Sequence, residues 1–282
     1  MTVSCRCSDL RSIALFMLLS VLSVPLAYGQ RDVWYLPQYR ETVISQALEI
    51  GSAFSRDTYL SESLYDGLTV GFEYDGWSGY KPEKILGYGR THSNIMFGEL
   101  TNRLDGGSTW LLNATFHQAA LWHVVDCSMC DLLIGPAGLL DLGVLYNVQN
   151  SNNPVNVDGY LAAGLCVDNT FRFLVHRYPM ALQATLYVPL AGIAFAPDYD
   201  QPYWYMYRYN EYGKALHFCC PFNNPAFTQQ ISLILPVGGE RIKVGYTFDY
   251  MTNKLGGHSR HMGGNSFSIG YVKRLESKKW NR

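Results

Sequence analysis

The chain has 282 residues, of which 48% are hydrophobic and only 16% are charged, and its formal net charge is -1. The low charge excludes a nucleic-acid-binding protein, which needs a basic face, and the high apolar content excludes a disordered chain. Tyr (21 residues) and Gly (26 residues) are abundant, and this composition is typical of an all-β protein at a membrane surface.

The first 29 residues are predicted to be a signal peptide. Arg6 and Arg11 precede an apolar run at 13–22, and Ala27-Tyr28-Gly29 provides a small-x-small cleavage site. The run is shorter than the roughly 20 apolar residues that a transmembrane helix needs. We therefore expect an exported mature domain at 30–282, which is either soluble or an outer-membrane β-barrel.

Apolar and polar residues alternate along most of this domain, which predicts β-strands. Within 241–250, for example, Lys243 and Asp249 fall on one face, and Val244 and Tyr246 fall on the other. Ten such runs are predicted, at 42–52, 64–76, 84–99, 109–125, 131–147, 157–175, 179–195, 226–236, 240–252 and 262–275.

The connections between these runs alternate in length. Short turns are predicted near 126–130, 176–178 and 237–239, and long loops are predicted near 100–108, 148–156, 196–225 and 253–261. Short turns at one end and long loops at the other are typical of an outer-membrane barrel, whose strand number is even. Ten strands fit best, and eight or twelve remain alternatives.

A soluble β-sandwich also alternates, but its polar face meets water and carries many charges. Here the polar face is mainly Ser, Thr, Gly, Asn and Gln, which suits the interior of a narrow barrel. Aromatic residues near strand ends suit the bilayer interface; they include Tyr74, Trp77, Trp110, Trp122, Tyr246, Tyr250 and Tyr271. The expected fold is an all-β, antiparallel up-and-down transmembrane β-barrel, with a short basic periplasmic tail at 276–282.

The predicted loop 196–225 is the first candidate site, because loops of this length are uncommon unless they are functional. Its aromatic residues can pack as a cap over the barrel mouth, or they can contact a sugar, lipopolysaccharide or partner protein. The candidate binding residues are Tyr199, Tyr203, Trp204, Tyr205, Tyr207 and Tyr209.

Cys127 and Cys130 form a Cys-x-x-Cys motif in a predicted short turn. Export to an oxidising compartment favours a disulfide between them over a zinc site. His117 and His123 share a face if their strand is regular, but no acidic partner is evident at matching spacing. We therefore expect hydrogen bonding in the interior, with no metal and no cofactor.

Two sets of residues are weighed as catalytic groups. His92 and Ser93 are adjacent, so a strand would point them to opposite faces, which argues against a hydrolase pair. His258 and His261 are predicted in the last loop, where Asp105, Asp198 and Asp200 of other loops could join them as general base and water activator. No catalytic residue is assigned on this basis.

Several segments in fixed order carry a family resemblance. They include Asp57-Thr58-Tyr59-Leu60-Ser61, Tyr146-Asn147, 150–154, 195–199, Pro221-Phe222-Asn223-Asn224-Pro225, Val244-Gly245-Tyr246 and Ile269-Gly270-Tyr271-Val272-Lys273. Together they resemble an uncharacterised family of Gram-negative outer-membrane proteins, a domain of unknown function typical of Bacteroidetes. The resemblance implies a β-barrel in the bacterial outer membrane and implies no settled activity.

The expected protein is a monomeric outer-membrane barrel with a structural role or a binding role through its aromatic loop. Its expected partners are outer-membrane lipid and lipopolysaccharide, with a surface partner or glycan as a further ligand, and no nucleic acid. The alternatives are a lipid or peptide hydrolase with residues at the barrel rim, and a small-solute channel.

Overall fold

The computed structural model describes residues 36–37, 41–80, 87–104, 106–150, 154–176, 178–198, 202–237 and 239–276. The predicted signal peptide lies outside these residues, and so does the predicted basic tail apart from Glu276.

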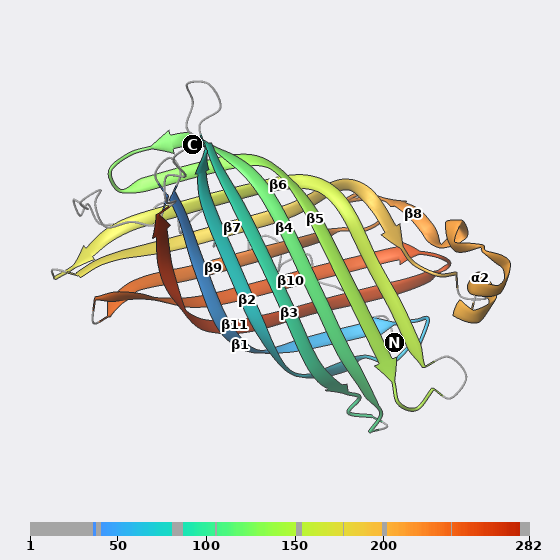
Figure 1. Ribbon diagram of the computed structural model, residues 1–282. Helices are drawn as coiled ribbons and strands as arrows, with labels where there is room; N and C mark the ends of the chain where they lie inside the picture. The colour runs from blue at the N-terminus through green and yellow to red at the C-terminus, as the bar shows by residue number, and fades with distance from the viewer. Residues whose placement is uncertain are drawn as a thin grey trace.

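The described chain folds into one closed, strongly tilted antiparallel β-barrel (Figure 1). Its sheet has eleven strands, of which the short β8 pairs with the end of β7 and lies outside the ring. The other ten form the barrel, as predicted, and the pairings of β1 with β11 and of β6 with β7 leave no open edge. The strands are β1 (Glu41–Asp57), β2 (Tyr65–Tyr80), β3 (Gly87–Thr101), β4 (Ser108–Asp126), β5 (Cys130–Asn147), β6 (Val155–Val175), β7 (Tyr178–Phe195), β8 (Leu216–Cys219), β9 (Ala226–Val237), β10 (Glu240–Leu255) and β11 (His258–Glu276).

The two ends of the barrel differ in their connections. Glu41 of β1 lies opposite Glu276 of β11, so the first and last strands begin and end at the same end, which we call the turn end. Strands β4 and β5 are joined there by 127–129, and β6 and β7 by 176–177. The opposite end, the loop end, carries the connection 196–225, which contains β8, α2 (Tyr203–Tyr209) and η2 (Tyr212–Ala215).

The outer face of the barrel is apolar. Leu48 and Leu68 are 69% and 73% exposed, and Leu161, Phe267 and Ile269 are each 63% exposed. A water-soluble protein rarely shows a continuous apolar surface of this extent. Because the ring is closed and every strand is paired, this surface can face hydrocarbon without unpaired backbone groups. The barrel therefore spans a bilayer.

No helix in the described part of the chain is long and apolar enough to cross a membrane.

The predicted long loop at 253–261 is wrong. β10 and β11 continue to Leu255 and His258, and only Gly256 and Gly257 connect them. Both glycines have positive φ, 62° and 74°, as a tight two-residue hairpin turn requires. The Gly-Gly pair was the signal for this turn. As a result, the two strands pair beyond the predicted boundaries.

The assignment of Trp77 to the membrane interface is also wrong. Its side chain is fully buried inside the barrel, beneath the guanidinium of Arg90. Trp77 lies on the same face of β2 as Glu73 and Asp75, because alternate residues of a strand share a face. Its position in the strand therefore indicates the interior. Trp110 and Tyr271, in contrast, lie on the outer face, and each is about half exposed.

We predict that Leu48→Arg destabilises the folded barrel by about 2–4 kcal/mol, because Leu48 lies at the middle of β1 on the outer face. The measurement is denaturant unfolding of the refolded protein in lipid vesicles. Gln149→Arg, at an exposed position at the loop end, serves as the matched control and is expected to change stability little. Equal effects of the two substitutions would contradict a lipid-facing outer surface.

Candidate functional site

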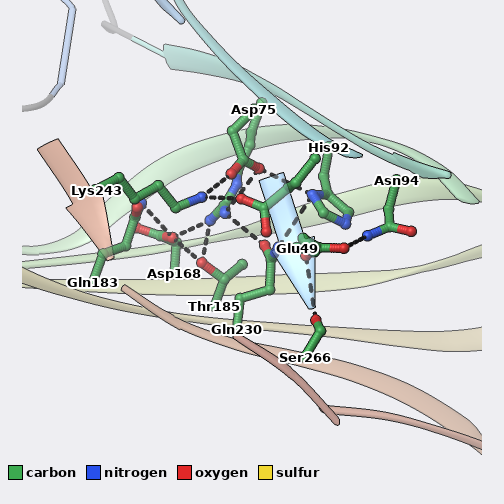
Figure 2. A network of polar contacts seen from close by, with 12 residues as sticks. Glu49, Asp75, His92, Asn94, Asp168, Gln183, Thr185, Gln230, Lys243 and Ser266 are labelled. Carbon is green, nitrogen blue, oxygen red and sulfur yellow. Dashed lines mark hydrogen bonds and ion pairs between the residues drawn. The ribbon is translucent and has the colours of Figure 1, made fainter. Parts of the chain in front are cut away.

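The barrel interior is crossed by a network of buried charged side chains (Figure 2). Lys243 of β10 donates to the carboxylates of Glu73 and Asp75, both from β2. All three side chains are almost completely excluded from solvent. Each charge therefore has a partner of opposite sign, as burial in a medium of low dielectric demands.

Arg90 of β3 extends this network to the far side of the barrel. Its guanidinium donates to Asp168 of β6 and Thr185 of β7, and to Oε1 of Gln230 in β9 at 3.0 Å. Asp168 also accepts from Gln183 Nε2 at 2.9 Å. The ring of Trp77 covers the guanidinium, with its centroid 4.8 Å from the central carbon.

His92 and Glu49 continue the network along the barrel axis. His92 Nδ1 lies 3.1 Å from Asp75 Oδ1, and Glu49 accepts from Asn94 and, at 3.3 Å, from Ser266 Oγ. Figure 2 shows these side chains converging from facing walls of the barrel. The interior at this level is thus filled by ion pairs and hydrogen bonds between strands on opposite sides.

Beyond the network lies a small cavity of about 30 Å³. Its lining includes Asn94, Thr115, Asp141, Tyr160 and Asp249. This space holds only a few water molecules, so it does not provide a continuous aqueous path.

The residue pattern predicts an interior of modest polar side chains with few charges, and this prediction is wrong. Alternation along their strands indicates that Lys243, Glu73 and Asp75 face the interior. Alternation cannot show that Lys243 contacts Glu73 and Asp75, because Lys243 lies about 170 residues from them in the chain.

The connection 196–225 is fixed to the barrel by its own side chains, of which Tyr203 is half-buried and Met206 and Ala215 are buried. The Tyr203 hydroxyl donates to Asn156 Oδ1 at 2.8 Å and accepts from the Val157 N–H at 2.6 Å. Burial raises the pKa of the Tyr203 phenol above its ordinary value, so the hydroxyl stays protonated. The side chains of Met206 in α2 and Ala215 in η2 are buried, so both short helices pack against the rest of the protein.

The remaining aromatic residues of α2 form what we call the aromatic surface: Trp204, Tyr205, Tyr207 and Tyr209. Trp204 is 66% exposed, Tyr207 80% and Tyr209 58%. The rings of Tyr205 and Tyr209 pack at a centroid distance of 4.5 Å. Figure 1 shows α2 projecting beyond the barrel wall at the loop end. Tyr199 lies outside the described residues, and the geometry makes Tyr203 an anchor of this loop.

Among the residues that the structure describes, the weighed catalytic groups do not come together. His258 and His261 lie in β11 and not in a loop; His258 is buried against Tyr59, and His261 Nδ1 lies 2.6 Å from Thr252 Oγ1. Asp198 lies near His217, at 4.0 Å, and Asp105 and Asp200 lie outside the described residues. His92 points inward and pairs opposite His117, whose strand neighbour Phe116 pairs with Ser93 on the outer face.

Cys127 and Cys130 flank the turn between β4 and β5, as their spacing predicted. Both are free thiols in the structure, and Cys130 Sγ lies 3.1 Å from Asn169 Oδ1. The disulfide stays a prediction. His117 is buried in the interior, whereas His123 lies at the turn end, where Asp131 faces it at 3.6 Å. The expectation that His123 lacks an acidic partner was therefore wrong.

The closed ring, the apolar outer face and the polar interior define an integral outer-membrane β-barrel protein. The chain belongs to the family described as "Protein of unknown function (DUF3316)", whose model matches residues 15–281. No curated protein matches the sequence.

Solved structures with a similar shape include outer-membrane proteins of several kinds. The outer membrane protease OmpT from Escherichia coli is 8% identical, with a TM-score of 0.47 over 87% of this chain and 100% of that one. The transport unit of the autotransporter AIDA-I from Escherichia coli is 8% identical, with a TM-score of 0.44 over 95% and 98%. An outer membrane channel from Pseudomonas putida F1 is 8% identical, with a TM-score of 0.33 over 90% and 100%. These similarities transfer no activity to this chain.

We predict that Lys243→Met destabilises the barrel by about 3–5 kcal/mol, because Glu73 and Asp75 would lose the cation between them. Lys254→Met, at an exposed position of the same strand, is the matched control. Both effects are measured by denaturant unfolding in vesicles. A Lys243→Met barrel as stable as the control would show that the ion pairs do not hold the interior together.

Proposed function

We propose that the protein is a surface-binding protein of the outer membrane and that the aromatic surface is its ligand site. The observation that carries this proposal is the exposure of four aromatic side chains on one seven-residue helix. Exposed Tyr and Trp side chains provide rigid contact area at a small loss of conformational entropy. The anchoring of α2 through Tyr203 and Met206 supports a preorganised site.

The ligand class that fits this surface best is a carbohydrate, and lipopolysaccharide of the same membrane is the first to test. Sugar rings pack on aromatic faces, and phenol hydroxyls and the indole N–H supply hydrogen bonds to their hydroxyl groups. Arg208, exposed in the last turn of α2, adds a positive charge suited to the phosphates of lipopolysaccharide. The assignment to a Bacteroidetes source stays a prediction.

The two alternatives have less support. A channel needs an open lumen, and here side chains from facing walls fill the interior. A rim hydrolase needs a base and a water activator in contact, and His258 and His261 lie in a strand with other partners. A monomer is in keeping with a ring whose strands are all paired within the chain.

We expect the double substitution Trp204→Ala/Tyr207→Ala to weaken binding of purified lipopolysaccharide at least tenfold, which is about 1.4 kcal/mol. Binding is measured by surface plasmon resonance with the refolded protein in detergent. Tyr178→Ala, which removes an exposed aromatic ring at the turn end, is the control and should bind as the wild type does. Unchanged binding by the double variant, or an equal loss in the control, would refute the assignment of this surface.

We also expect the reconstituted wild-type protein to show no steady ion conductance in planar bilayers, because its lumen is filled by the network of Lys243 and Arg90. Regular unitary conductance steps would instead support the channel alternative. A known open porin incorporated under the same conditions provides the positive control.

A further inference from the structure

Three side chains that can ligate a metal gather at the turn end, away from the aromatic surface. They are His123 and Asp126 at the end of β4 and Asp131 at the start of β5, and we call them the turn-end triad. One ligand atom of each lies within 4.8 Å of the others. Asp131 is buried, His123 is partly buried, and Asp126 is exposed, so the triad opens toward water.

A β-bulge assembles the triad. In a regular strand, residues three apart point to opposite faces, so His123 and Asp126 would be separated by the barrel wall. The pairing of β4 with β5 shifts between His123 and Val125, which inserts one extra residue. His123 then pairs opposite Leu133, and Asp126 pairs opposite Asp131. Leu133 and Asp131 share the inner face of β5, so all three ligating side chains lie on that face.

The spacing of two of these groups fits an ion between them. His123 Nε2 and Asp131 Oδ1 are 3.6 Å apart, which is too long for a hydrogen bond. Two ligands that each lie about 2.1 Å from one tetrahedral ion are separated by roughly 3.4 Å.

Neighbouring side chains hold both ligands in place. The other oxygen of Asp131, Oδ2, accepts a hydrogen bond from Arg172, which orients the carboxylate with Oδ1 toward His123. The ring of Tyr88 meets the imidazole edge-on, with a centroid distance of 5.2 Å. A hydrogen bond to the ligating carboxylate, such as the one from Arg172, is typical of metal sites.

We propose that the turn-end triad binds a divalent transition-metal ion, Zn²⁺ being the best match, with water in the remaining coordination position. One imidazole and two carboxylates suit Zn²⁺, whereas Ca²⁺ and Mg²⁺ prefer six or more oxygen ligands. Because Arg172 neutralises part of the Asp131 charge, the affinity is expected to be lower than that of a four-ligand structural zinc site. This proposal is independent of the binding role of the aromatic surface.

Cys127 and Cys130, in the adjacent turn, are the competing source of ligands. The test therefore separates the triad from the two thiols. Zn²⁺ is titrated into the refolded full-length protein in detergent at neutral pH, and binding is followed by isothermal titration calorimetry. We expect one Zn²⁺ per chain, and at least tenfold weaker binding by His123→Gln and by Asp126→Asn.

Two variants serve as controls. His176→Asn changes an exposed histidine at the same end, and Asn tolerates the positive φ of 59° at this position. It should bind Zn²⁺ as the wild type does, and so should Cys127→Ser/Cys130→Ser. Heat-modifiable migration on gels shows that each variant is folded, and the exposed position of Asp126 makes its variant the one that tests the site without disturbing the interior.

Several outcomes would overturn the proposal. They are no Zn²⁺ bound by the wild type, a loss in His176→Asn as large as in His123→Gln, and loss of binding in the double Cys variant while His123→Gln retains it. The last outcome would assign the ion to the thiols instead of the triad.

Discussion

A strand in hydrocarbon has no water to satisfy its backbone N–H and C=O groups, and this constraint governs the whole molecule. The sheet meets it by closing, through the pairing of β1 with β11 and of β6 with β7. Closure in turn creates two environments, an outer face that must be apolar and an inner face that is cut off from bulk water. The buried charges of Lys243 and Arg90 are tolerated because other strands bring them the carboxylates of Glu73, Asp75 and Asp168.

The alternation of apolar and polar residues was enough to predict the barrel. It placed strands at 131–147 and 226–236, and the structure has them at Cys130–Asn147 and Ala226–Val237. Alternation is informative because each side chain of a barrel strand faces either the lipid or the barrel interior. Two of the errors have a local signal in the sequence, namely the Gly256-Gly257 pair and the position of Trp77 on the same strand face as Glu73 and Asp75.

Much less of the candidate sites could be predicted. The sequence shows that α2 is rich in aromatic residues. It does not show that Tyr203 anchors the loop while Tyr207 is exposed, because this difference depends on the fold. The bulge near His123 has no clear sequence signature, and it reverses the faces of Val125 and Asp126, the residues that follow it in β4. Asp126 therefore lies beside His123, although a regular strand would separate them. Alternation gives the face of a residue but not which residues meet across the lumen.

The interior ion pairs join residues that lie far apart in the chain, and this separation affects how the barrel assembles. Lys243 lies 168 residues from Asp75 in the chain, so their contact cannot form until β10, the ninth strand of the ring, is in place. Until then, each charge is either hydrated or exposed to acyl chains at a large free-energy penalty. A partly inserted intermediate is thereby disfavoured, and the last steps of ring formation become cooperative. The buried ion pairs thus favour the completed ring over a partly assembled one.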